Sequence, residues 1–231
     1  CEMDEIINIA KENNLSIIED ASQGVGVFYK NKHVGLFGEF GILSYYGNKT
    51  ITTGEGGVVL TKEKILRDKI YMLKNHGRMT KGTFIHETLG WNFSFTEMQA
   101  AIGISQMNKL DKIIKKKDKL YQKYSENIVS NNIKMKNVPK TTTSPVHWFS
   151  NVVCEDSENL QNFLKTFGIP SRRIFYPLNK QPCLRNNKNV LNDIQEFSNS
   201  EQAFKSILSL PSSILMSEEQ FNYIIEKINQ Y

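Results

Sequence analysis

A single lysine, Lys49, lies in the polar segment SYYGNKTITTGEGG at 44–57, which joins two apolar stretches of the sequence. A lysine at the end of a strand can be partly desolvated, which lowers the pKa of its amine and frees it to attack a carbonyl. Upstream, the apolar run LSII at 15–18 is followed by Glu19 and Asp20, where a buried strand would end. An amine and a carboxylate at neighbouring strand ends suit pyridoxal phosphate (PLP), which requires a lysine for its Schiff base and a carboxylate beside its ring nitrogen.

The elements expected around these residues alternate between helices and short strands. The apolar spacing of the first residues is helical, and the later apolar runs are short and bounded by glycine. The four residues GEGG at 54–57 would reverse the chain, so that the strand after them pairs with the strand before Lys49. We expect a helix over 3–11, strands over 16–18, 40–45 and 58–61, and a helix over 64–73.

The second half of the chain predicts a long helix and then a small α+β domain. Thr96 is a fitting N-cap for one helix that continues to about residue 128. A polar stretch at 131–144 is the expected boundary, and beyond it we expect a helix over 158–168, a strand within RRIFYPL and a final helix over 217–230. The predicted domains are 1–130, part of a large domain with its long linking helix, and 131–231, a small C-terminal domain.

The composition is that of an ordinary globular protein of 231 residues, with 39% hydrophobic residues and a formal net charge of +5. Its basic residues are spread along the chain except at 112–119, which we interpret as the solvated face of a helix, so no nucleic-acid partner is predicted. Three widely separated cysteines indicate neither a disulfide framework nor a metal site. The cysteine pattern fits a reducing cytoplasm, where we expect the protein to be. No apolar run approaches the roughly 18 residues that span a bilayer, so no membrane partner is predicted.

Four separated segments resemble one family in the same order and at its spacing. They are IIEDASQGVG, HVGLFGEFGILSYYGNKTITTGEGGVVLT, GWNFSFTEMQAAIGISQ and RIFYPLNKQP. The chain resembles the DegT/DnrJ/EryC1/StrS sugar-nucleotide aminotransferases, and GNKTITTGEGG is most similar to the members that aminate a GDP-linked 4-keto-6-deoxy sugar. The resemblance implies an α/β protein of the PLP-dependent aspartate aminotransferase type (fold type I).

The same resemblance implies a role for each matching residue. Lys49 would be the Schiff-base lysine and proton carrier, and Asp20 would pair with the pyridinium nitrogen. Gln23 would contact the ring and its 3-hydroxyl, and Ser44 would donate to the cofactor phosphate. Asn92 would reach the phosphate of a cofactor bound mainly to the other subunit, which implies a homodimer.

The function implied is transfer of an amino group from L-glutamate to a nucleotide-linked keto-deoxysugar, with a 4-keto-6-deoxyhexose as the expected substrate, for surface polysaccharide or glycan biosynthesis. One alternative is a PLP-dependent sugar dehydratase of the same fold, which has histidine in place of the lysine; Lys49 speaks against it. Family chains carry a further segment before the position of Cys1, so this chain is expected to lack the N-terminal part of the large domain. The second alternative is therefore a truncated, non-catalytic remnant.

Overall fold

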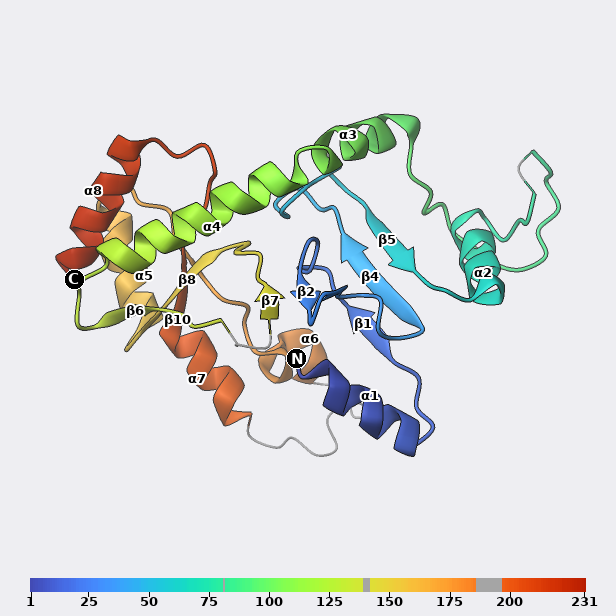
Figure 1. The fold of residues 1–231 in the computed structure, drawn as a ribbon, viewed down its shortest axis with the longest axis horizontal. Coiled ribbons are helices and arrows are strands. Elements are labelled where there is room, and N and C mark those ends of the chain that lie inside the picture. Colours follow the sequence, from blue (N-terminus) through green and yellow to red (C-terminus); the bar gives the residue numbers. More distant parts are fainter. Residues whose placement is uncertain (81, 139–141, 186–196) are drawn as a thin grey trace. The chain divides into compact units, whose positions relative to one another are not determined.

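The computed structural model describes residues 1–80, 82–138, 142–185 and 197–231 (Figure 1). The chain divides into two compact units. Unit 1 comprises Cys1–Ile114 and Val138–Val146, and unit 2 comprises Lys115–Asn137 and His147–Tyr231. The first division, between Ile114 and Lys115, falls inside helix α4 (Leu110–Asn127), whereas the predicted division at residue 130 falls after this helix. Residues 139–141 of the polar stretch that was expected to form the boundary lie outside the described residues.

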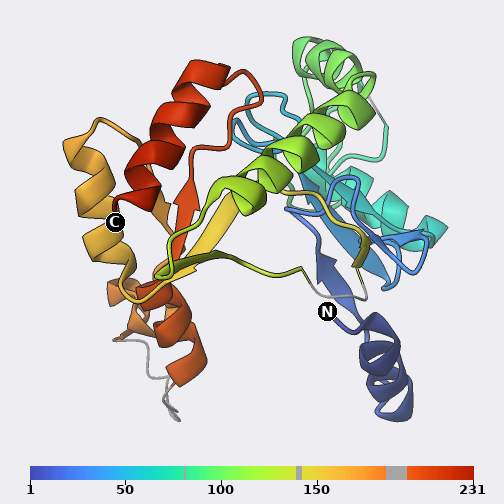
Figure 2. The same cartoon turned by 60° about the vertical axis from the view of Figure 1, so that its left-hand side comes forward.

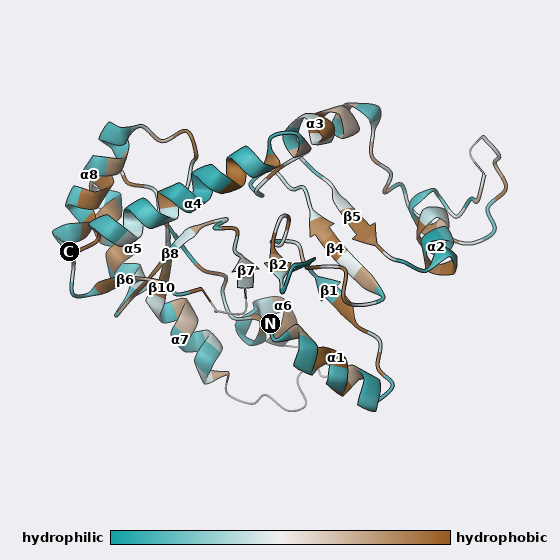
Figure 3. Cartoon of the chain, viewed as in Figure 1, coloured by the Kyte–Doolittle hydropathy of each residue, from teal (hydrophilic) through white to brown (hydrophobic). Residues whose placement is uncertain are grey.

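Among its described residues, unit 1 contains two small sheets. In the first, the strand order is β1-β4-β5, with β1 parallel to β4 and β4 antiparallel to β5, as the glycine-rich reversal at 54–57 predicts. Figure 3 shows that β4 and β5 are largely hydrophobic. The strands of this sheet are β1 (Ile18–Asp20), β4 (Phe40–Ser44) and β5 (Gly57–Leu60). In the second sheet the order is β3-β2-β7, from β2 (Phe28–Tyr29), β3 (Lys32–His33) and β7 (Thr142–Ser144).

The helices of unit 1 are α1 (Met3–Glu12), α2 (Lys64–Lys74), α3 (Glu97–Met107) and the start of α4 (Leu110–Asn127). Thr96 is the N-cap of α3, as predicted, in a reciprocal capping box: its hydroxyl accepts from the Gln99 amide at 3.2 Å, and the Gln99 side chain accepts from the Thr96 amide at 3.0 Å. The prediction of one long helix was wrong. The two helices are separated at Asn108 and Lys109, where the α-helical hydrogen-bond pattern breaks: the Lys109 amide bonds to the Gln106 carbonyl, three residues back, which tightens the turn.

Glu19 fastens the loop between β3 and β4 to the end of β1. Its carboxylate accepts from the backbone amides of Gly35, Phe37 and Gly38 at 2.7, 2.5 and 2.9 Å. The loop can lie this close to the sheet because position 41 in β4 has no side chain: a Cβ there would stand 1.9 Å from the Gly35 carbonyl oxygen. Of the two adjacent acids, Glu19 therefore has a structural role.

We expect Glu19→Gln to lower the free energy of unfolding by about 1–2 kcal/mol, because a neutral amide accepts these backbone hydrogen bonds less strongly than a carboxylate does. Urea denaturation followed by circular dichroism measures the change. The control Glu12→Gln, at an exposed position that ends α1, should stay within about 0.5 kcal/mol of the parent. Equal stability of the Glu19 variant and this control would contradict the anchoring role.

Unit 2 is an antiparallel sheet of order β6-β8-β10-β9 with helices packed on it. In both views α5 and α8 lie side by side next to this sheet (Figures 1 and 2). Fully buried side chains from α4, β8, α5, β10 and α8 form the core, among them Tyr124, Val152, Leu160, Leu208 and Ile228. The elements are β6 (Ile133–Met135), β8 (Ser150–Cys154), α5 (Ser157–Thr166), β9 (Arg172–Arg173), the 3-10 helix η1 (Leu178–Lys180), α6 (Pro182–Arg185), α7 (Ser198–Ser206), β10 (Ile207–Leu210) and α8 (Glu218–Asn229).

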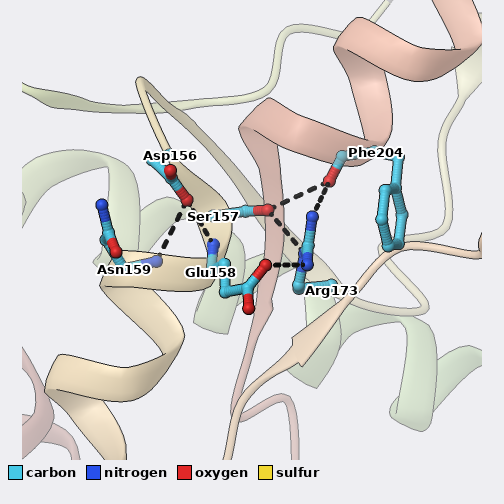
Figure 4. Close-up of polar contacts among 6 residues, drawn as sticks. All are labelled: Asp156, Ser157, Glu158, Asn159, Arg173 and Phe204. Carbon is cyan, nitrogen blue, oxygen red and sulfur yellow. Dashed lines mark hydrogen bonds and ion pairs between the residues drawn. The ribbon is translucent and has the colours of Figure 1, made fainter.

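Arg173 joins three elements of unit 2 (Figure 4). Its guanidinium donates to the Ser157 hydroxyl at 3.1 Å, to the Glu158 carboxylate at 2.7 Å and to the Phe204 carbonyl at 3.4 Å. The guanidinium also lies 3.9 Å from the centre of the Phe204 ring. Of the strand expected within RRIFYPL, only Arg172 and Arg173 are paired, with Ser209 and Leu208 of β10, and Pro177 is the N-cap of η1.

In the part of the chain that the structure describes, no helix has the length and apolar character needed to cross a bilayer.

Candidate active site

The candidate site lies at one edge of the first sheet of unit 1. Because β1 and β4 are parallel, their carboxyl ends meet at the same edge, and Asp20 is paired in register with Ile42, two residues before Ser44. Asp20 is exposed and Ser44 half-buried, so both side chains are accessible there. The sheet thus brings together two residues that are 24 positions apart in the sequence.

Asp20 is held as an anion by its immediate neighbours. Its Oδ1 accepts a hydrogen bond from the Ser22 amide at 3.1 Å and another from the Ser22 hydroxyl. These bonds, the hydroxyl first, lower the pKa of Asp20 below its ordinary 3.8, and the positive charge of Lys49 lowers it further; partial burial acts in the opposite direction. Lys49 is therefore close enough to Asp20 for the two charges to interact.

Lys49 lies in a turn that the surrounding chain fixes. Its backbone amide bonds to the Tyr46 carbonyl at 3.0 Å, and Tyr45 bonds through its carbonyl to the Thr53 amide at 2.9 Å. The residues that follow the lysine, Thr50 and Ile51, are buried at 9% and 2% exposure, while Lys49 itself is half-buried. The backbone that carries Lys49 is therefore held by hydrogen bonds and by the buried residues that follow it. Its expected lowered pKa stays a prediction.

Ser44 and Gln23 lie on the two segments that leave this edge. The Ser44 hydroxyl accepts from the Tyr46 amide at 3.3 Å, which orients it at the start of the lysine turn. Gln23 is exposed in the turn after β1, which closes where the Gly24 amide bonds to the Ala21 carbonyl at 2.8 Å.

Asn92 belongs to a different part of unit 1. It forms an isolated antiparallel bridge with Asn75, the C-cap of α2, and the amide of its neighbour Phe93 bonds to the Lys74 carbonyl at 3.0 Å. Its exposure leaves the side chain accessible. The sheet edge thus gathers Asp20 and Ser44 with the Lys49 turn, whereas Asn92 is positioned by the end of α2.

Ser22 is a residue that the sequence-based site did not include. It contributes both donors to Asp20 and is the largest influence on the charge of that carboxylate. The spacing of an aspartate and a serine two residues later, directly after a strand, is typical of a local side-chain-to-backbone turn and could have identified it.

The donor set fits the chemistry of PLP. An anionic carboxylate can face a protonated ring nitrogen, a primary amine can bond to the aldehyde, and hydroxyl and amide groups can hydrogen-bond the phosphate and the ring. The parallel pairing of β1 with β4 supports this fit, because it places Asp20 and the Lys49 turn at the same edge of the sheet, and the two ends of the pyridine ring each need a partner.

Comparisons with known proteins support the family resemblance found in the sequence. The sequence profile described as the DegT/DnrJ/EryC1/StrS aminotransferase family matches residues 1–229. The chain is 35% identical over 236 residues to the GDP-perosamine synthase of Escherichia coli O157:H7, covering 100% of this chain and 62% of that protein. It is 32% identical over 218 residues to the UDP-4-amino-4,6-dideoxy-N-acetyl-beta-L-altrosamine transaminase of Campylobacter jejuni strain 81-176, covering 91% of this chain and 57% of that protein.

Two solved structures show the same fold. An aminotransferase of the DegT DnrJ EryC1 StrS type from Brucella abortus matches with a TM-score of 0.86 at 26% identity, covering 100% of this chain and 61% of that one. PseC, an aminotransferase from Helicobacter pylori, matches with a TM-score of 0.89 at 22% identity, covering 100% of this chain and 63% of that one. The fold is therefore that of the PLP-dependent aminotransferases of fold type I.

The chain belongs to the DegT/DnrJ/EryC1/StrS aminotransferase family, whose aminotransferases use PLP. It spans about 62% of the length of the E. coli relative.

Proposed function

We propose that this chain is part of a PLP-dependent aminotransferase that transfers an amino group from L-glutamate to a nucleotide-linked 4-keto-6-deoxyhexose. The observation that carries the proposal is the parallel pairing of β1 with β4, which brings Asp20 and Ser44 to the edge of the sheet from which the Lys49 turn leaves. The 35% identity to a GDP-perosamine synthase supports a GDP-linked sugar, and a role in surface polysaccharide or glycan biosynthesis follows from such a product.

Each residue has a defined task in this proposal. PLP, when bound, supplies an electron sink that makes a proton on the carbon next to nitrogen removable. Asp20 would keep the ring nitrogen protonated, and Lys49 would first anchor the cofactor and then carry the proton between two carbon atoms. Ser44 would donate to the cofactor phosphate, and Gln23 would contact the ring and its 3-hydroxyl.

The test is cofactor uptake followed by a two-substrate assay. The purified chain is mixed with PLP, and we expect a visible absorption band that bleaches on addition of L-glutamate. GDP-linked and UDP-linked 4-keto-6-deoxy sugars are then offered separately, and mass spectrometry detects the amino sugar; the GDP-linked one should be the better substrate. A chain that stays colourless with PLP would favour the non-catalytic remnant. Loss of water from the sugar in place of amination would favour the dehydratase.

We also propose that the active form is a cytoplasmic homodimer. Apolar side chains near Asn92 in sequence are strongly exposed, including Phe84 at 85%, Leu89 at 88% and Phe93 at 72%. Exposed apolar residues gathered in one segment are typical of protein interfaces. The cysteines at 1, 154 and 183 are free thiols, which supports a reducing compartment.

If Asn92 reaches the cofactor of the partner subunit, variants lacking different residues should complement each other. A heterodimer of Lys49→Ala and Asn92→Ala subunits holds one site with both residues intact and one with neither. Equal mixing and reassembly should therefore restore about a quarter of the parental activity. Size-exclusion chromatography with differently tagged subunits confirms the heterodimer. A purified heterodimer no more active than the Asn92→Ala homodimer would show that the sites are not shared.

A further inference from the structure

Only one of the two adjacent acids at the end of β1 is available for a ligand. The Glu19 carboxylate accepts from three backbone amides of the 35–38 loop. Asp20, on the opposite face of the strand, is exposed and interacts with the charge of Lys49. Asp20 is thus the acid that can face the ring of a bound cofactor, and whether it does so depends on the orientation of its side chain.

Ser22 fixes that orientation through one oxygen. Its backbone amide and its hydroxyl both donate to Oδ1 of Asp20. Two donors on the same oxygen hold the carboxylate plane in one position, and Oδ2 is then the oxygen that a ring nitrogen can approach. Hydrogen bonds to the ionised form also hold the pKa of Asp20 low, the Ser22 hydroxyl being the largest cause.

The backbone around Ser22 is fixed independently of its side chain. The turn closes through the Gly24 amide and the Ala21 carbonyl at 2.8 Å, and Ala21 is buried at 8% exposure. A Cβ at position 24 would stand 2.5 Å from a methyl group of Val34, so the turn is packed closely against its neighbour. Removing the Ser22 hydroxyl should therefore leave the hydrogen bond from the Ser22 backbone amide to Asp20 in place. The variant then isolates the contribution of the hydroxyl.

We propose that Ser22 is a positioning residue of the amino-transfer site: its hydroxyl fastens Oδ1 of Asp20 so that Oδ2 meets the ring nitrogen of PLP. This inference rests on the proposed function, because it assigns Asp20 to that nitrogen. It predicts that Ser22 acts through Asp20 and not through the substrate.

The test compares Ser22→Ala with Ser22→Thr, which keeps a hydroxyl, and with Ser130→Ala, which removes a serine hydroxyl that accepts from a loop amide in unit 2. In the cofactor-free protein, carbon NMR of labelled aspartate, assigned with Asp20→Asn, follows the carboxyl of residue 20 with pH. We expect the pKa of Asp20 to rise in Ser22→Ala, to return in Ser22→Thr and to be unchanged in Ser130→Ala. In the PLP-loaded protein, kcat should fall roughly tenfold in Ser22→Ala with KM for the sugar unchanged.

An unchanged pKa of Asp20 in Ser22→Ala would overturn the inference, and so would a rise in KM without a fall in kcat. The failure of the proposed function looks different: the parent protein itself would take up no PLP, whatever residue stands at position 22.

Discussion

Replacing Lys49 with alanine is expected to abolish covalent attachment of PLP and all transamination while leaving the fold intact. The attachment needs a primary amine at this point of the β4–β5 turn, and alanine supplies none. The backbone of the turn is held by the Tyr46 carbonyl and by buried residues after position 49, so we expect the free energy of unfolding to change by about 1 kcal/mol or less. Borohydride reduction followed by intact-protein mass spectrometry measures the attachment.

The matched control is Lys64→Ala, which removes an exposed lysine paired with Asp68 at 3.2 Å on α2. This variant should retain the mass increase after reduction and the activity of the parent. Undiminished trapping in Lys49→Ala would show that another amine holds the cofactor, and the site assigned to the β4–β5 turn would then be wrong.

The second large effect is expected at Asp20. Asparagine keeps the shape of the side chain and an oxygen for the Ser22 donors but loses the charge that keeps a pyridine nitrogen protonated. We therefore expect Asp20→Asn to bind PLP measurably while its turnover falls by a factor of roughly a hundred or more. Visible absorption measures the binding, and the amino-sugar assay measures the turnover.

The pH dependence follows from the lowered pKa of Asp20. Its charged form predominates at every pH above 3.8. If activity falls on acidification while the pH is still above 3.8, the group that titrates is therefore not Asp20.

The control for Asp20→Asn is Asp4→Asn, which removes an exposed partner of Lys30 and should leave turnover unchanged. Equal turnover of Asp20→Asn and the parent would assign Asp20 a structural role only.

The sequence by itself predicted the main helices and strands and named the residues of the candidate site, whose roles stay predictions. Apolar runs bounded by glycine located β4 and β5 to within a residue, because local hydrophobic periodicity and turn residues act over short distances. Thr96 was recognisable as an N-cap for the same reason, since its capping box closes within four residues.

Only the tertiary structure decided which residues meet. The parallel pairing of β1 with β4 brings Asp20 to the edge from which the Lys49 turn leaves, and this pairing joins segments about twenty residues apart. The same pairing separates the roles of the adjacent acids, because side chains alternate across a strand and the 35–38 loop takes up Glu19 alone. The break of the expected long helix at Asn108 was likewise invisible in the periodicity, since apolar residues continue on both sides of it. Spacing along the chain specifies local hydrogen bonds, whereas strand pairing and loop packing depend on contacts between distant segments that no local pattern encodes.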